Sequence, residues 1–144
     1  MQDAQAGGLT PRRIVFDLDG CLCSQVEGDY EQARPFPEAI AVVNRLYRDG
    51  YQIIIHTARF MGRNRNDMHQ AYHDGYELTK RQLAAWGVLY HCLIMGKPPA
   101  DVVVDDRAVF FTPQWELIER HIREELGGTD SHEVIRRHGQ PSGN

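Results

Sequence analysis

The sequence has little cysteine, no excess of positive charge and no long apolar run. Only three cysteines are present: Cys21, Cys23 and Cys92. An odd number, with two of them one residue apart, does not form a disulfide framework and is typical of a reducing compartment. The closely spaced pair also lacks a second pair that would complete four zinc ligands, so we interpret these residues as ordinary thiols. We therefore expect a cytoplasmic protein.

The charge balance is evidence against a nucleic-acid partner, and the hydropathy is evidence against a membrane span. Lysine and arginine total 16 against 20 acidic residues, a net charge of −4, so no basic surface for a nucleic-acid backbone is expected. No apolar run approaches the ~20 residues needed to span a bilayer, and the N-terminal residues do not resemble a signal peptide. The 144 residues suit one domain. We expect a flexible lead over residues 1–11, the domain over 12–126, and a partly disordered tail over 127–144.

Short apolar runs alternate with helical patterns along the chain. Predicted strands cover residues 13–16, 52–56, 91–94 and 102–104. Almost every position in them is apolar, as in strands buried on both faces of a parallel sheet. Helices are predicted over residues 37–49, 78–86 and 113–126, the last with Thr112 as its N-cap and Pro113 in its first turn. This order predicts an α/β fold with a mainly parallel sheet.

Polar residues follow the predicted strands. The first strand ends at Asp17 and Asp19, the second at Thr57 and the fourth at Asp105 and Asp106, while Lys97 precedes the fourth. The carboxyl ends of parallel strands share one edge of the sheet, where open α/β folds bind ligands. We therefore expect these six side chains to converge.

Four acids in one crevice would repel one another, and a hard divalent cation such as Mg²⁺ would offset that repulsion. The hydroxyl of Thr57 and the ammonium of Lys97 suit the oxygens of a phosphoryl group. One of Asp17 and Asp19 could then attack phosphorus while the other transfers protons. Each feature alone would be an ordinary turn, cap or solvated residue. Their joint placement at strand ends favours phosphoryl chemistry.

The motifs "DLDGCL", "IIIHTAR", "GKP" and "VVVDD" occur in this order between residues 12 and 110. In that order they resemble the four motifs of the haloacid dehalogenase (HAD) superfamily, whose members are mostly magnesium-dependent phosphatases. The resemblance implies a three-layer Rossmann-like core. It also implies that Asp17 is the nucleophile that forms an aspartyl-phosphate and that Asp19 is the general acid/base. Thr57 and Lys97 would bind phosphate.

The same resemblance implies a Mg²⁺ site. Asp17, the backbone carbonyl of Asp19 and Asp105 would hold the ion, and Asp106 would assist through water. Cys21 stands where the first motif commonly has threonine, and the loss of a hydroxyl there would affect loop geometry or rate.

A finer resemblance rests on "HTARF", "ELTKRQLAAWGV" followed by "YH", and "MGKPPADVVVDDRA". These stretches are similar to small HAD phosphatases associated with capsule and surface-polysaccharide synthesis. The resemblance implies a small phosphorylated metabolite as substrate, such as a sugar phosphate or sugar-linked phosphate.

The spacing of the motifs leaves no room for a cap domain, only for a short flap within residues 21–34. The site would then be open, and a neighbouring subunit of a homo-oligomer could complete it. We expect the polar stretch 60–76 to set substrate choice. Substrate-binding residues are predicted near the phosphate and in this stretch: Gly20, Thr57, Ala58, Arg59, Arg63, Arg65 and Lys97. His69 and His73 could share a helix face and bind metal, but a solvated face is favoured.

Two other functions fit part of the pattern. A phospho-receiver domain also combines acids, a threonine and a lysine on a parallel sheet, but its acidic pair precedes the phosphorylated aspartate, the reverse of the order here. A catalytically weakened module that only binds a phosphorylated ligand would agree with Cys21.

Overall fold

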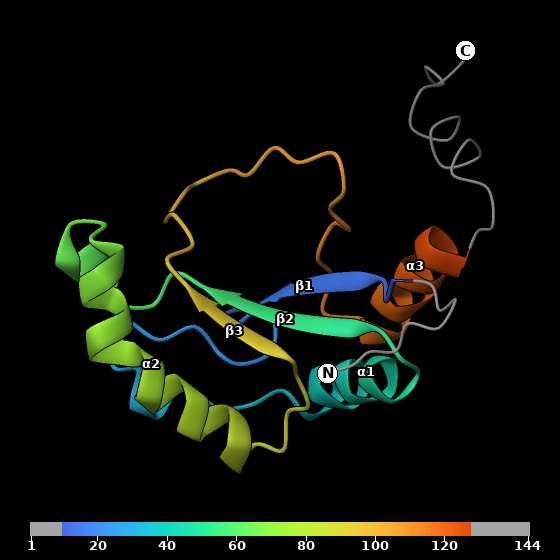
Figure 1. The fold of residues 1–144 in the computed structure, drawn as a ribbon, viewed down its shortest axis with the longest axis horizontal. Coiled ribbons are helices and arrows are strands. Elements are labelled where there is room, and N and C mark those ends of the chain that lie inside the picture. The colour runs from blue at the N-terminus through green and yellow to red at the C-terminus, as the bar shows by residue number, and fades with distance from the viewer. Residues whose placement is uncertain (1–9, 128–144) are drawn as a thin grey trace. The chain divides into compact units, whose positions relative to one another are not determined.

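The computed structural model describes residues 10–127 (Figure 1). These residues divide into two compact units, with the boundary between Val104 and Asp105. The first unit contains three strands, two α-helices and two short 3₁₀ turns: β1 (Arg13–Asp17), η1 (Tyr30–Gln32), α1 (Pro37–Arg48), β2 (Gln52–Thr57), η2 (Gly62–Asn64), α2 (Met68–Ala85) and β3 (Cys92–Met95). The second unit contains α3 (Trp115–Gly127). Most of the predicted N-terminal lead and all but the first residue of the predicted tail lie outside the described residues.

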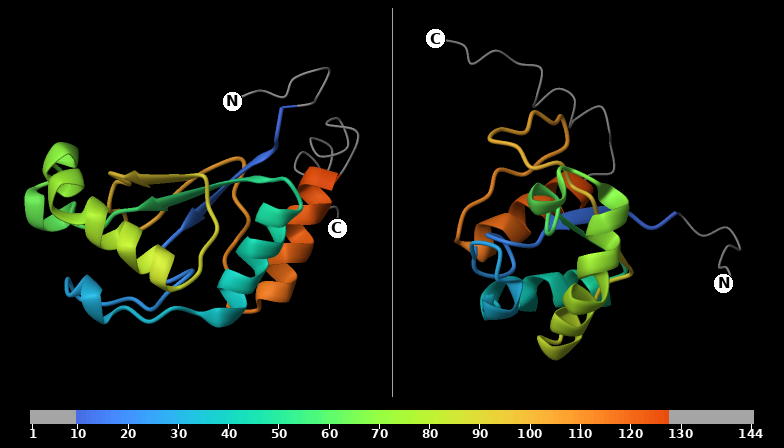
Figure 2. Two further views of the ribbon diagram at one scale, coloured as in Figure 1. Left: turned by 60° about the horizontal axis from the view of Figure 1, so that its bottom comes forward. Right: turned by 90° about the vertical axis from the view of Figure 1, so that its left-hand side faces the viewer.

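The strands of the first unit form one parallel sheet in the order β1-β2-β3. Phe16 of β1 is in register with Ile55 of β2, which is in register with Leu93 of β3. The connections between successive strands contain α1 and α2, and both helices lie on the same face of the sheet (Figure 2). The predicted Rossmann-like α/β class is therefore confirmed.

Burial alternates along the strands, contrary to the expectation that both faces would be covered. On the buried face lie Ile14, Phe16, Ile53, Ile55, Leu93 and Met95. On the opposite face Val15 is 57% exposed and Ile94 is 37% exposed. The reason is topological: successive crossovers in one direction along a sheet place their helices on the same side. Apolar composition alone did not predict which face is covered.

Helix α1 matches the sequence prediction, and α2 begins earlier than predicted. Pro37 occupies the first position of α1, where its missing N–H costs nothing, and Gly50 follows the helix with a positive φ of 99°. The side chain of Asp67 accepts a 3.2 Å hydrogen bond from the backbone N–H of Gln70, which caps α2. The helix therefore starts at Met68 rather than at residue 78, and it includes the second half of the polar stretch 60–76.

The predicted fourth strand, residues 102–104, is wrong. The valines there are exposed and belong to no strand. Gly96 turns the chain after β3 with a φ of 91°, and Pro98 and Pro99 have no N–H groups to donate to a neighbouring strand. The run is apolar, but the segment leading into it is poorly suited to pairing.

In the second unit, α3 begins at Trp115, so Thr112 and Pro113 precede the helix instead of forming its cap and first turn. The Thr112 hydroxyl accepts a hydrogen bond from the backbone N–H of Gln114, at 3.4 Å. Within α3, Arg123 and Glu119 form an ion pair one turn apart. No helix among residues 10–127 is long and apolar enough to cross a membrane.

Candidate active site

The turn after β1 is organised around a single carbonyl group. The carbonyl oxygen of Leu18 accepts hydrogen bonds from the backbone N–H groups of Cys21, Leu22 and Cys23, at 3.1, 2.8 and 3.3 Å. Gly20 has a φ of 86°, which few other residues adopt, and its N–H donates to the carbonyl of Cys23. Leu18 and Leu22 are fully buried and anchor the turn. The backbone that carries the two aspartates is therefore closely held.

Three of the predicted site residues meet where the strands end. The ammonium of Lys97 lies 3.1 Å from Oδ1 of Asp17, and both side chains are about one-third exposed. The backbone N–H of Lys97 donates to the carbonyl of Thr57, at 3.1 Å, which holds the segment after β3 beside the end of β2. Residues forty positions apart in the chain thus meet at the strand ends, where Lys97 pairs with the Asp17 carboxylate and its backbone is held by Thr57.

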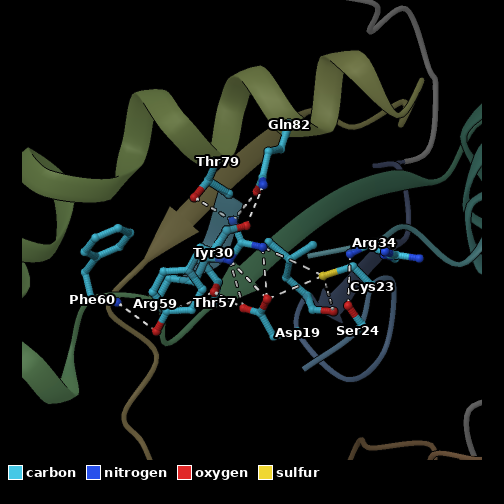
Figure 3. Close-up of polar contacts among 11 residues, drawn as sticks. Asp19, Cys23, Ser24, Tyr30, Arg34, Thr57, Arg59, Phe60, Thr79 and Gln82 are labelled. Atoms are coloured by element: carbon cyan, nitrogen blue, oxygen red, sulfur yellow. Dashed lines mark hydrogen bonds and ion pairs between the residues drawn. The ribbon is translucent and has the colours of Figure 1, made fainter. Parts of the chain in front are cut away.

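Asp19 lies in a second, more enclosed cluster (Figure 3). Arg59 donates to Oδ1 through Nε and Nη2, at 3.1 and 2.9 Å, and to Oδ2 through Nε at 3.0 Å. The Thr57 hydroxyl donates to Oδ2 at 3.3 Å, and the same Thr57 oxygen accepts from the backbone N–H of Arg59. The side chain of Asp19 is 13% exposed. Both carboxylate oxygens therefore have fixed donors.

Arg59 is 1% exposed, although the sequence suggested a contact with substrate. Besides Asp19 it contacts two residues of α2, since its Nη1 donates to Thr79 and Gln82. A substrate contact would require the guanidinium to leave these partners. The part played by Arg59 at Asp19 was missed, as were Thr79 and Gln82. The available signal was a "TxxQ" spacing in α2, which places the two polar residues on one helix face.

The remaining predicted substrate residues differ in position. Gly20 belongs to the turn after β1, and Ala58 is half-buried beside Thr57. Arg63 lies over the rings of Tyr30 and Phe60 and donates to the carbonyl of Gly28. Arg65 is exposed in a left-handed conformation, with a φ of 54°. His69 and His73 are exposed on α2, and His73 pairs with Asp74.

The predicted metal ligands come from both units. Asp17 and Asp19 belong to the first, whereas Asp105 and Asp106 begin the second, where Asp105 accepts a hydrogen bond from the N–H of Arg107. Among residues 10–127 no three His, Cys, Asp or Glu side chains gather into a metal site. In the first unit the Asp17 carboxylate is the half-open one, and Asp19 is bound to Arg59. The first unit alone therefore does not supply a full ligand set.

The electrostatics around the turn keep the neighbouring thiols neutral. Burial, together with the adjacent Asp17, raises the pKa of Cys21 to about 11. Burial and the adjacent Asp19 raise the pKa of Cys23 to about 12. Burial and the Lys97 ammonium lower the pKa of His56, which is in register with Asp17. Around neutral pH these groups therefore add no charge beside the aspartates.

These features define an α/β protein whose parallel sheet gathers two aspartates, a threonine, a lysine and a buried arginine at its carboxyl edge. No family model matches the chain. No curated protein matches it either.

Two solved structures are similar in fold. The crystal structure of a Vibrio cholerae protein described only as an MCSG target has a TM-score of 0.65 and 23% identity, and the match covers 87% of this chain and 94% of that one. This likeness supports the fold. The D,D-heptose 1,7-bisphosphate phosphatase from B. bronchiseptica, solved with magnesium and phosphate, has a TM-score of 0.43 and 17% identity over 81% of this chain and 64% of that one. The TM-score of this second structure is too low to support an inference about this chain.

Proposed function

We propose that this chain is a magnesium-dependent phosphomonoesterase that acts through an aspartyl-phosphate on a small phosphorylated metabolite. One observation carries the proposal: Asp17, Thr57 and Lys97 meet at the ends of adjacent parallel strands, with Asp19 two residues beyond Asp17. The order of the four motifs along the chain agrees with it.

The two aspartates have different surroundings, which suit different roles. Asp17 is half-open and faces one ammonium group, so its free oxygen can attack phosphorus. Lys97 would stabilise the negative charge that develops on the phosphoryl oxygens. Asp19 is enclosed and bonded through both oxygens, which suits a group that must transfer a proton at a fixed place.

The proposal includes a Mg²⁺ ion. Its ligands would be Asp17, the backbone carbonyl of Asp19 and Asp105, with Asp106 acting through water. When bound, such an ion neutralises charge between the attacking carboxylate and the phosphoryl group.

The substrate we propose is a sugar phosphate or a sugar-linked phosphate of surface-polysaccharide synthesis. The first unit has only a short flap at the site. An antiparallel bridge between Cys23 and Pro35 joins the two ends of this flap. The two ends are also joined by a 2.9 Å hydrogen bond from the backbone N–H of Ser24 to the carbonyl of Arg34. A flap of this size leaves the site open to a small polar metabolite.

A screen of phosphorylated metabolites tests the function directly. Purified protein is incubated with each compound and Mg²⁺, and released phosphate is measured with and without EDTA. We expect release from at least one small phosphomonoester and its loss in EDTA. No release from any ester, or full activity in EDTA, would contradict the proposal.

A further inference from the structure

We propose that Arg59, supported by Tyr30 of the flap, is a positioning residue that fixes the Asp19 carboxylate for proton transfer. This inference rests on the proposed phosphatase function and gives Arg59 a role other than the substrate contact that the sequence predicted. Arg59 would act through Asp19, without touching the reacting atoms.

Arg59 and Thr57 together fix the orientation of the Asp19 carboxylate. A carboxylate on a short side chain can rotate, but both oxygens of Asp19 accept from Arg59, and Oδ2 also accepts from Thr57. The carboxylate therefore has one favoured orientation. A shift of about 1 Å at a reacting group is enough to lower a rate about 10²-fold.

Arg59 is itself held on several sides (Figure 3). Its Nη1 donates to Thr79 and Gln82 of α2. The centre of its guanidinium lies 4.9 Å from the centroid of the Tyr30 ring. A buried arginine with this many partners is rigid enough to orient another group.

Tyr30 joins the flap to the same cluster of side chains. Its carbonyl accepts from Nε2 of Gln82 at 2.6 Å, and its ring lies 4.9 Å from that of Phe60. Arg63 lies over the Tyr30 ring as well, 5.4 Å from the centroid. Tyr30 thus reaches Asp19 through one intermediate residue, Arg59, so the position of the flap affects how Arg59 holds the carboxylate.

The step that depends on this arrangement is the departure of the alcohol. The bond from phosphorus to the leaving oxygen breaks as the bond to Asp17 forms, and the carboxylic-acid form of Asp19 gives its proton to the leaving oxygen. The carboxylate left behind is the form that Arg59 and Thr57 hold. An alkyl or sugar leaving group needs that proton, because its anion is unstable in water. A p-nitrophenolate leaves readily without it. Misplacing the Asp19 side chain should therefore slow the hydrolysis of an alkyl or sugar phosphate far more than that of p-nitrophenyl phosphate.

The test compares wild type, Arg59→Met, Arg59→Lys, Asp19→Asn and the double variant Asp19→Asn/Arg59→Met. The substrates are p-nitrophenyl phosphate and the alkyl phosphate that wild type hydrolyses fastest in the screen. Arg81→Met, an exposed change on the same helix as Gln82, is the matched control. Thermal unfolding establishes which variants are folded. If Arg59→Met does not fold, Arg59→Lys, which keeps the positive charge, takes its place in the comparison.

We expect Arg59→Met to lower kcat about 10²-fold for the alkyl phosphate, with a much smaller loss for p-nitrophenyl phosphate and little change in KM. Arg59→Lys should recover part of the loss, and Arg59→Met should cost little more once Asp19 is already asparagine. Equal losses on both esters, or a full additional loss in the double variant, would overturn the positioning role while leaving the phosphatase intact. A wild type inactive on both esters would instead overturn the proposed function, and the inference with it.

Discussion

Asp17 and Asp19 are separated by one residue, yet each is paired with a different cation. Lys97 approaches Asp17 at a half-open position, while the buried Arg59 holds Asp19. Buried charge is tolerated only where it is paired and hydrogen-bonded, and Asp19 meets both conditions. The pairing separates the two carboxylates into an accessible one and an oriented one, which is the division of roles that phosphoryl transfer through an aspartate requires.

The cysteines of the turn give a prediction at this scale. The thiolate is the reactive form, and the pKa values of Cys21 and Cys23 are raised to about 11 and about 12. We expect a thiol reagent such as DTNB to label the exposed Cys92 first at pH 7.5, and Cys21 and Cys23 much more slowly. Raising the pH should speed the labelling of Cys21, because its raised pKa means that its thiolate fraction is still increasing toward pH 11.

Cys92→Ser provides the control, since it should remove the fast phase and leave the slow one. A fast phase that survives in Cys92→Ser at neutral pH would show that the turn is more open, or its thiols more acidic, than the structure indicates.

Residue by residue, the sequence could predict the meeting of Asp17, Thr57 and Lys97, because each follows or precedes a strand and parallel strands end at one edge. The sequence could not predict which way the side chain of Arg59 turns. A side chain two residues past a strand can turn outward to a ligand or inward to a neighbour, and only the packing of α2 against the sheet decides between them.

Among the elements, α2 has one position where close packing matters. A Cβ added to Gly75 would lie 2.2 Å from Cδ2 of Phe60 and 3.1 Å from Cε of Met95. Phe60 has little freedom to move, since it is buried and its ring packs against that of Tyr30. We expect Gly75→Ala to lower the free energy of unfolding by about 1–3 kcal/mol, measured by urea denaturation, despite the better helix propensity of alanine.

Gly62 is a matched control, because a Cβ there would meet nothing within 4 Å and its φ is not positive. Gly62→Ala should be neutral or slightly stabilising. Equal unfolding midpoints for the two variants would mean that Phe60 and α2 are not packed as described.

The elements also show what the sequence could not give. The three paired strands follow from apolar runs, and α1 follows from its spacing, its proline and its glycine. The first half of α2 did not, because its residues are polar and its cap, Asp67, resembles any turn residue. The run at residues 102–104 had the composition of a strand, but pairing depends on a partner edge that composition does not contain.

For the whole molecule, the question is whether the second unit supplies metal ligands to the first. If Asp105 is a Mg²⁺ ligand, Asp105→Asn should raise the Mg²⁺ concentration needed for half-maximal phosphate release at least ~10-fold. Asp101→Asn changes an exposed aspartate of the first unit and should leave the Mg²⁺ dependence unchanged. The same Mg²⁺ requirement in wild type and Asp105→Asn would remove Asp105 from the proposed ligand set.

Phosphate release by Asp17→Asn shows whether Asp17 is the nucleophile of a phosphatase. Asparagine keeps the size of the side chain but cannot form the covalent intermediate, and loss of a nucleophile lowers kcat on the order of 10⁴–10⁶-fold. Wild type and variant are compared on the best ester of the screen at equal Mg²⁺, after thermal unfolding has shown that both are folded. We expect the variant to release phosphate at the background rate, whereas release within tenfold (roughly 1.4 kcal/mol) of wild type would contradict the assignment of Asp17 as the nucleophile.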